Sequence, residues 1–339
     1  MLLKKLSEAF GPSGCEQEVR TILREELKDH ISEWQRDALG NLIACKPAAA
    51  GPRVMVAAHM DEVGLMISSV DSAGLLHFHK VGGIDDRVLV SKPVLVGKER
   101  VRGVIGAKAI HLQRPEERTQ VIPHRSLFID IGAKSKEEAL EKVKIGDYVI
   151  FATQYGELGA SMAKGKAFDD RAGCAILAEL LKEDYSFPLY GAFTVQEEVG
   201  LRGAGVAAYA IEPDLAIVLE GTTCNDVSGI EEHEYSTVIG GGPAITFMDT
   251  SAVGNKAMIR ELVRLAEANG IPYQFKGTVT GGNDAGRINI SRAGVPVVAV
   301  SIPCRYIHSP VSLLSLADVE HSKALVKLFL RSIEGGFRV

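Results

Sequence analysis

Val54-Met55-Val56-Ala57-Ala58-His59-Met60-Asp61-Glu62 is the stretch of this 339-residue chain that decides its fold class. The first five residues form an uninterrupted apolar run, which is typical of a strand covered on both faces. Such strands belong to parallel sheets with helices packed on each side. Polar residues follow the run at once, and sheets of this kind place their ligands beyond the carboxyl ends of the strands. We therefore expect an α/β fold with a site at this strand end.

Buried strands and amphipathic helices alternate in the segments around this stretch. Helices are predicted over 2–10, 16–28, 172–181, 201–209, 256–268 and 316–332, and further strands over 41–45, 190–195, 215–219 and 295–302. Together they predict a doubly wound, mostly parallel sheet with helices on both faces, which forms a catalytic domain from residues 1–68 and 161–339.

An insertion at residues 69–160 interrupts this pattern. Its β-prone runs are short and separated by Gly or Pro turns, and they cover 75–78, 88–90, 94–96, 101–105, 127–131 and 148–152. This texture predicts a small β-barrel. Within it, Asp85-Asp86-Arg87 follows Gly82-Gly83 and is expected to form a turn.

Composition excludes several classes of function. The 38 basic and 43 acidic residues give a formal charge of −5, so no basic field predicts a nucleic-acid or anionic-membrane partner. No apolar stretch approaches the roughly 18 to 20 residues of a membrane span, and the N-terminus lacks a signal-peptide pattern. Five scattered cysteines form no Cys-x-x-Cys pair. We expect a cytoplasmic protein whose function resides in a local site.

Chemically capable side chains stand at four predicted strand ends and one helix start. They are His59 and Asp61, Glu197 and Glu198, Glu220, His308, and Asp169 and Asp170. Each alone has an ordinary interpretation as a core histidine, a solvated charge pair or a helix cap. At one sheet edge, however, so many carboxylates and imidazoles are costly to bury unless cations hold them.

Mixed imidazole and carboxylate donors favour Zn, Co or Mn over Ca or Mg. Five such groups with one shared carboxylate can hold two ions about 3.5 to 4 Å apart around a bridging water. The sequence therefore predicts a dinuclear hydrolytic site. Residues 280–284 lack the Gly-Lys-Ser/Thr end of a phosphate loop, so we expect Gly281, Gly282 and Asn283 to line the pocket and contact substrate.

With these residues identified, the chain resembles the tetrahedral aminopeptidases, a family of dinuclear metallopeptidases that includes glutamyl aminopeptidases and proteins formerly labelled cellulase M. The motifs that carry the resemblance run nearly end to end: Gly11-Pro12-Ser13-Gly14-Cys15-Glu16, Ala58-His59-Met60-Asp61-Glu62-Val63-Gly64, Phe168-Asp169-Asp170-Arg171-Ala172-Gly173, Gln196-Glu197-Glu198-Val199-Gly200, Gly281-Gly282-Asn283-Asp284-Ala285 and His308-Ser309-Pro310.

The resemblance implies a set of metal ligands. Asp169 bridges two metal ions, His59 and Glu220 complete one site, and Glu198 and His308 complete the other. The ligand at position 220 is commonly Asp in the family, whereas this chain has Glu.

The resemblance also implies catalytic roles for two further residues. Glu197 is the general base, and Asp61 orients the imidazole of His59. The peptide bond between residues 169 and 170 is strained or cis in the family.

The resemblance implies an aminopeptidase that removes N-terminal residues from short peptides with two divalent ions, Zn or Co first and Mn third. It also implies that the insertion is a dimerisation domain and that dimers assemble into a hollow tetrahedral dodecamer. Because the insertion lies between His59 and Asp169, the aminopeptidase group is favoured over carboxypeptidase-like and deacylase relatives.

Two other classes of function remain open from the sequence. One is a glycoside hydrolase that uses Glu197 and Glu220 as paired carboxylates. The other is a metal-loaded, inactive scaffold that assembles through the insertion. The preferred N-terminal residue of a peptide substrate does not follow from the sequence.

Overall fold

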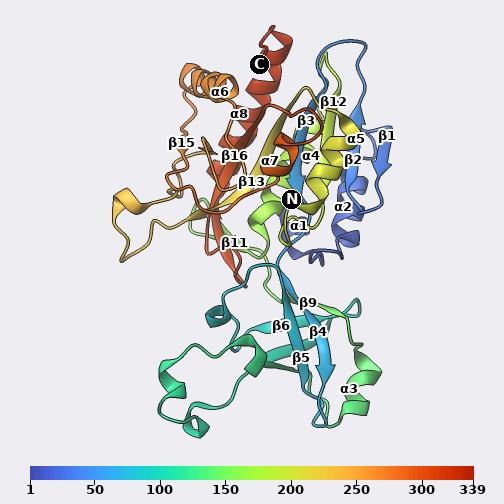
Figure 1. Ribbon diagram of the computed structural model, residues 1–339, viewed down its shortest axis with the longest axis vertical. Coiled ribbons are helices and arrows are strands. Elements are labelled where there is room, and N and C mark those ends of the chain that lie inside the picture. Colours follow the sequence, from blue (N-terminus) through green and yellow to red (C-terminus); the bar gives the residue numbers. More distant parts are fainter.

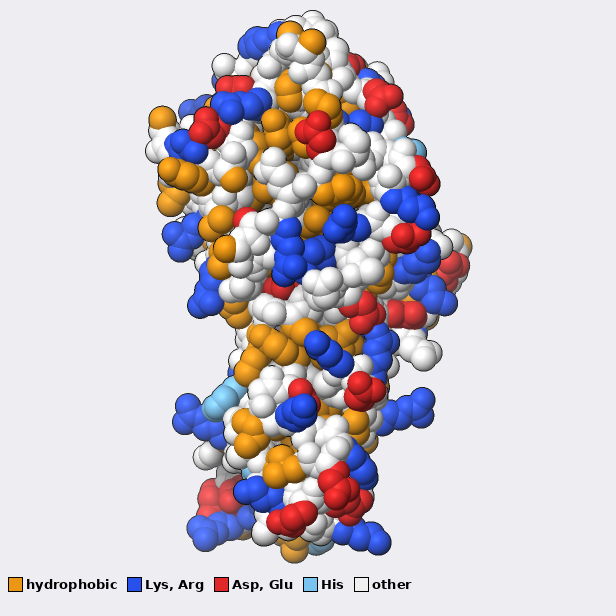
Figure 2. Space-filling model, turned by 90° about the vertical axis from the view of Figure 1, so that its right-hand side faces the viewer, with side chains coloured by type: hydrophobic (Ala, Val, Ile, Leu, Met, Phe, Trp, Pro, Cys, Tyr) orange, Lys and Arg blue, Asp and Glu red, His pale blue; other side chains and the backbone are white.

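A large sheet and a closed barrel form the two lobes of the computed structural model, which describes residues 1–339 (Figure 1). The barrel hangs below the sheet lobe, and the connections that precede β4 and follow β9 cross the narrow junction between them. No helix has the length and apolar character that a membrane span needs. Acidic and basic side chains are interspersed over the face that Figure 2 shows, and apolar side chains gather near the junction.

The sheet has a parallel centre and antiparallel edges. Its strands run in the order β1 (Glu33–Arg36), β2 (Leu42–Lys46), β12 (Leu189–Thr194), β3 (Val54–His59), β13 (Leu215–Cys224), β16 (Val297–Arg305), β17 (Ser312–Ser315), β11 (Met162–Gly165) and β10 (Gly156–Leu158). The four central strands, β12, β3, β13 and β16, are parallel to one another. The remaining strands along this order pair in antiparallel fashion, and the short β14 (Ala244–Ile245) and β15 (Gln274–Phe275) extend the sheet beside β16.

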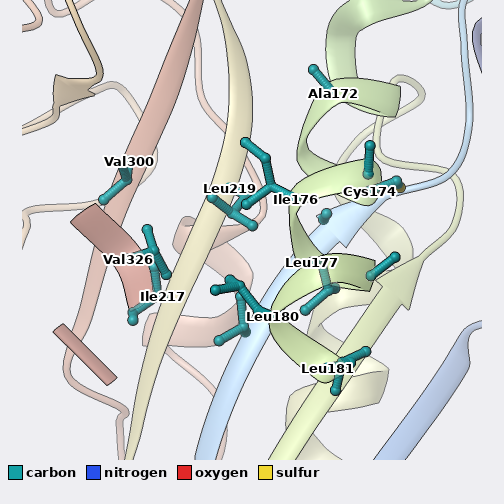
Figure 3. Close-up of a cluster of buried hydrophobic side chains, with 14 of the residues drawn as sticks. Ala172, Cys174, Ile176, Leu177, Leu180, Leu181, Ile217, Leu219, Val300 and Val326 are labelled. Carbon is teal, nitrogen blue, oxygen red and sulfur yellow. The ribbon is translucent and has the colours of Figure 1, made fainter. Parts of the chain in front are cut away.

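Helices cover both faces of this sheet, which confirms the predicted fold class. One face carries α1 (Leu2–Glu8), α2 (Gln17–Leu27), α4 (Phe168–Leu181), α6 (Lys256–Asn269) and α8 (Leu316–Glu334), and the other carries α5 (Arg202–Ile211) and α7 (Ala285–Asn289). The alternation along β3 produces this division, because Val56 packs into the first apolar core while Met55 and Ala57 pack into the second. Figure 3 shows Ile176 and Leu180 of α4 beside Ile217 and Leu219 of β13.

The lower lobe is a closed antiparallel barrel with its own apolar core. Its strands follow the order β4 (Gly64–Val70), β5 (Leu76–Val81), β8 (Phe128–Asp130), β7 (Val101–Gly106), β6 (Pro93–Val96) and β9 (Tyr148–Phe151). Helix α3 (Lys136–Lys142) and the short 3-10 turns η1 (Asp86–Val88), η2 (Ile110–Leu112), η3 (Glu117–Thr119) and η4 (His124–Ser126) connect them, and a fifth turn, η5 (Glu232–Glu234), belongs to the sheet lobe. The domain division at residues 69 and 160 remains a proposal; the strand pairing places the whole of β4 in the barrel and β10 in the large sheet.

The strand expected at residues 88–90 is wrong. Asp85 caps η1 by accepting a hydrogen bond from the backbone N–H of Arg87, and this local bond bends the chain into a 3-10 turn. Val88 is therefore the last residue of this 3-10 turn and Val90 follows it, and the turn expected at Asp85-Asp86-Arg87 is confirmed.

A buried ion cluster fixes the loop after β3 against the start of α4. Lys166 Nζ donates to both carboxylate oxygens of Glu62 at 2.7 Å, and Arg171 reaches the same carboxylate at 3.3 Å. Arg171 Nε also donates to the carbonyl of Met60 at 2.7 Å. All three charged side chains are buried, so each depends on the others for compensation. This cluster holds the two segments that contain His59 and Asp169.

Candidate metal centre

The predicted ligand residues converge on one edge of the sheet. His59 is the last residue of β3, Glu220 lies within β13, and Asp169 lies in the first turn of α4. Glu198 and His308 lie in the loops that follow β12 and β16. The four strands are parallel, so these side chains meet as the sequence pattern requires.

The carboxylate of Asp169 lies between two imidazoles. Its Oδ1 is 3.2 Å from Nε2 of His59, and its Oδ2 is 3.4 Å from Nε2 of His308. Glu220 Oε1 lies 3.2 Å from the His59 nitrogen, and Glu198 Oε2 lies 3.2 Å from the His308 nitrogen. The five side chains thus form two groups that share one carboxylate.

These residues fit divalent metal ions. Nδ1 of His59 lies 3.1 Å from the carbonyl oxygen of Asp61, a contact that places the ring proton on Nδ1 and leaves the Nε2 lone pair facing the carboxylates. That lone pair and carboxylate oxygens 3.2 Å away repel unless a metal ion or a proton lies between them. In addition, Glu220 Oε2 is buried without a hydrogen-bond partner. Ligand atoms of His59, Asp169 and Glu198, and of His59, Asp170 and Glu220, lie within 4.8 Å of one another.

The electrostatics of the site indicate a deficit of positive charge. Burial raises the pKa of Glu198 to about 7 and also raises the pKa of Glu220. Burial opposes protonation of His308, but a hydrogen bond to Asp169 and the charge of Glu198 raise its pKa to about 9. Burial would raise the pKa of Asp169, yet hydrogen bonds from His308 and His59 lower it. Protons neutralise part of the negative charge of these buried carboxylates, and two divalent cations would neutralise it in full.

Glu197 differs from its neighbour because it faces no imidazole at contact distance. Burial, opposed by His59 and reinforced by Asp284, raises the pKa of its carboxyl to about 10. The side chain is 9% exposed. A buried carboxyl group that lies beside the ligands but pairs with neither histidine is placed as a general base or acid would be.

Asp61 connects the two halves of the site. Its Oδ1 accepts a hydrogen bond from the backbone N–H of Glu197 at 3.0 Å, and its Oδ2 accepts one from that of Glu198 at 3.1 Å. Oδ1 also lies 3.4 Å from Nδ1 of His59. The hydroxyl of Ser13 donates to Oδ2 at 2.6 Å. Sequence reasoning did not identify this role of Ser13, and its only signal was the position of Ser13 in the Gly11–Glu16 motif.

Asp169 and Asp170 are joined by a cis peptide bond. This is one of the two possibilities, strained or cis, that the resemblance implied. The carboxylate of Asp170 accepts hydrogen bonds from the backbone N–H groups of His59 at 3.2 Å and Gly173 at 3.0 Å. Asp170 therefore also acts as the helix cap that this sequence pattern commonly indicates.

The Gly281-Gly282-Asn283 segment packs against the loop at residues 249–251. The side-chain amide of Asn283 donates to Asp249 at 3.1 Å, and its carbonyl oxygen accepts from the backbone N–H of Ala285 at 2.9 Å. A Cβ at Gly282 would lie 2.8 Å from Cβ of Ser251, so the backbone approaches this loop closely.

Asp284 follows Asn283 in the chain and was not among the residues predicted for the site. It is buried, accepts a hydrogen bond from Thr194, and keeps Oδ1 unpartnered. Its signal in the sequence was an acidic residue directly after the Gly-Gly-Asn segment.

Comparison with known proteins gives concordant matches. Residues 40–325 match the family described as M42 glutamyl aminopeptidase. A putative aminopeptidase of Acetivibrio thermocellus is 41% identical over 337 residues, covering 98% of this chain and 97% of the relative. A solved TET aminopeptidase from a marine sediment archaeon (Thaumarchaeota) has a TM-score of 0.94 and 40% identity, covering 99% and 98% of the two chains. The Pyrococcus horikoshii TET1 peptidase, which assembles into a tetrahedron or a large octahedral shell, has a TM-score of 0.85 and 36% identity, covering 96% and 97%.

Proposed function

The chain belongs to the M42 glutamyl aminopeptidase family, and we propose that it is a dinuclear metal-dependent enzyme that removes N-terminal residues from short peptides. Membership of the family gives a hydrolase that acts on peptide bonds. The observation that supports a two-metal site is the carboxylate of Asp169, whose two oxygens face the imidazoles of His59 and His308.

In this proposal Asp169 is the shared ligand, with His59 and Glu220 on one side and Glu198 and His308 on the other. Zn or Co fits this mixed donor set best, and Mn follows. When bound, such a pair of ions supplies Lewis-acid activation of the scissile carbonyl and of the attacking water.

Glu197 takes the proton of the attacking water and returns it to the leaving amine. Its backbone is held by Asp61, so the carboxylate keeps its place beside the ligands. The carboxyl group of Asp284, which lies outside this ligand set and keeps Oδ1 unpartnered, attracts the free ammonium group of the substrate, which explains removal of one residue from the N-terminus. We also propose that Gly281, Gly282 and Asn283 line the pocket that binds the substrate.

We further propose that the barrel mediates dimerisation and that dimers assemble into a dodecamer. The support is the similarity to the Pyrococcus horikoshii peptidase over nearly the whole chain. Analytical ultracentrifugation of the purified protein is expected to give a species of twelve chains of 36.4 kDa each. A protein that stays monomeric at all concentrations would contradict this assembly.

The activity is tested with chelated protein and single metals. Aminoacyl amides and short peptides with acidic, basic and apolar first residues are incubated with the chelated enzyme, and Zn, Co or Mn is added in turn. We expect no hydrolysis after chelation and recovery with at least one metal, accompanied by release of the first residue only.

Two outcomes of this assay would contradict the proposal. In a parallel incubation with glucans, release of sugar by the chelated protein would favour a glycoside hydrolase that uses Glu197 and Glu220, although that function leaves both histidines unexplained. A stable oligomer that binds metal but hydrolyses no peptide would indicate a scaffold.

A further inference from the structure

The barrel places backbone against the candidate metal centre at Gly82 and Gly83. A Cβ added at Gly82 would lie 3.4 Å from Cβ of Glu198 and 2.9 Å from Cγ1 of Val63. A Cβ added at Gly83 would lie 3.6 Å from Nδ1 of His308. These two glycines follow β5 of the inserted barrel, so the insertion forms part of the wall around the Glu198 and His308 half of the site.

The backbone of these glycines is free to form hydrogen bonds with a ligand. The N–H and C=O groups of Gly82 and Gly83 make no hydrogen bond within the chain. Immediately before them, Val81 is paired with Gly64 in the barrel, and immediately after them, the carbonyl of Ile84 accepts from Lys80. Gly83 is exposed and Gly82 is half-buried. Two adjacent residues thus present unpaired donors and acceptors next to the metal ligands, as main-chain peptide recognition requires.

This segment is also held in place. Lys80 Nζ donates to the Ile84 carbonyl and to Asp86, each at 2.7 Å. Gly82 has φ +86°, a conformation in which a side chain would be strained, so glycine is needed there. The side chain of Ile84 is buried in the barrel core. A fixed, unpaired backbone binds a peptide with little loss of conformational entropy.

The distribution of charge sets the direction of the substrate. The unpartnered acidic oxygen outside the proposed ligand set belongs to Asp284. Asp284 accepts a hydrogen bond from Thr194, which is the register partner of His59, so this acid lies on the His59 side of the site. The ammonium group of the substrate is therefore expected on the His59 side. The peptide beyond the scissile bond then extends toward the barrel.

We propose that the Gly82–Gly83 backbone binds the main chain of the peptide substrate immediately beyond the scissile bond. This inference rests on the proposed aminopeptidase function. It gives the inserted barrel a part in peptide binding in addition to assembly, and it predicts a preference for peptides over aminoacyl amides.

The test uses three substrates that share the best first residue: the aminoacyl amide, a tripeptide, and the same tripeptide methylated on the nitrogen of its second peptide bond. With the wild-type enzyme we expect kcat/KM to fall about tenfold on methylation, because the methyl group replaces the one N–H of that bond and one hydrogen bond is lost. In Gly83→Ala the new methyl group shields the N–H and C=O groups of residue 83 from the substrate. We expect an about tenfold lower kcat/KM for the tripeptide, no further effect of methylation, and less than a twofold change for the amide.

Gly205→Ala is the matched control, because its Cβ would also make only ordinary contacts, 3.6 Å from Cβ and 3.9 Å from the carbonyl oxygen of Arg287 on α7. It is expected to leave all three substrates unchanged. Equal losses for amide and tripeptide in Gly83→Ala, or insensitivity of the wild-type enzyme to methylation, would overturn the inference while the aminopeptidase function stands. Insensitivity of the wild-type enzyme to methylation overturns the inference even where the variant fails to fold. Absence of hydrolysis of every substrate with every metal would instead refute the function itself.

Discussion

Glu197→Gln is expected to keep the full metal content of the enzyme and to lose about 10² to 10⁴-fold in kcat, the range that a general base contributes. The amide has the shape of the carboxylate but cannot accept the proton of the attacking water. Glu197 faces neither imidazole at contact distance, so the ligand set is untouched. Turnover of the best peptide and metal content per chain, measured on the same sample, separate catalysis from metal binding.

The matched control is Glu179→Gln, which makes the same chemical change on the surface of α4. The Glu179 side chain is 44% exposed and pairs only with Lys182, so activity and metal content are expected to stay within twofold of wild type. Near-normal turnover in Glu197→Gln would show that the base lies elsewhere. Loss of metal in that variant would instead make Glu197 a ligand.

The sheet could be predicted from the sequence where burial alone determines the strands. The apolar run at 54–58 is covered on both faces, so its composition reveals its place at the centre of the sheet. The edge strands β10, β11 and β17 gave no such signal. They are three or four residues long, and the pairing of β11 with β17 joins segments about 150 residues apart, which no local pattern encodes.

The candidate site could be predicted in its residue types but not in its connections. His, Asp and Glu at parallel strand ends predict a metal centre, because parallel strands bring their ends together. That Asp61 accepts hydrogen bonds from the turn at Glu197 and Glu198 and from Ser13 depends on the relative placement of three distant segments. The approach of Gly82 and Gly83 depends on how the barrel docks, and glycines in a turn carry no chemical signal by themselves.

Asp169→Asn is expected to abolish activity through a different defect, the loss of both metal ions. A carboxylate can give one oxygen to each of two cations, and the two oxygens of Asp169 already face different imidazoles. Asn keeps the size of the side chain but replaces one oxygen with an NH₂ group that repels a cation. By contrast, Glu220 faces only the His59 group, so Glu220→Gln is expected to weaken one site and to leave the other filled. Metal content by mass spectrometry after dialysis against limiting metal should therefore give two ions per chain for wild type, one for Glu220→Gln and fewer than one for Asp169→Asn.

Asp184→Asn is the control for the charge change, because Asp184 is 97% exposed and its loss should alter neither metal content nor turnover. Solution mass and far-ultraviolet circular dichroism establish that the Asp169 variant has folded, so that metal loss is not a consequence of unfolding. If Asp169→Asn retained two ions per chain, the shared carboxylate could not be the feature that holds them together. If it retained one ion at wild-type affinity, the two groups of ligands would act as independent sites. The cooperative loss of both ions is expected because the excess of buried carboxylates around Asp169 requires two dications rather than one, as the raised pKa values of Glu198 and Glu220 indicate.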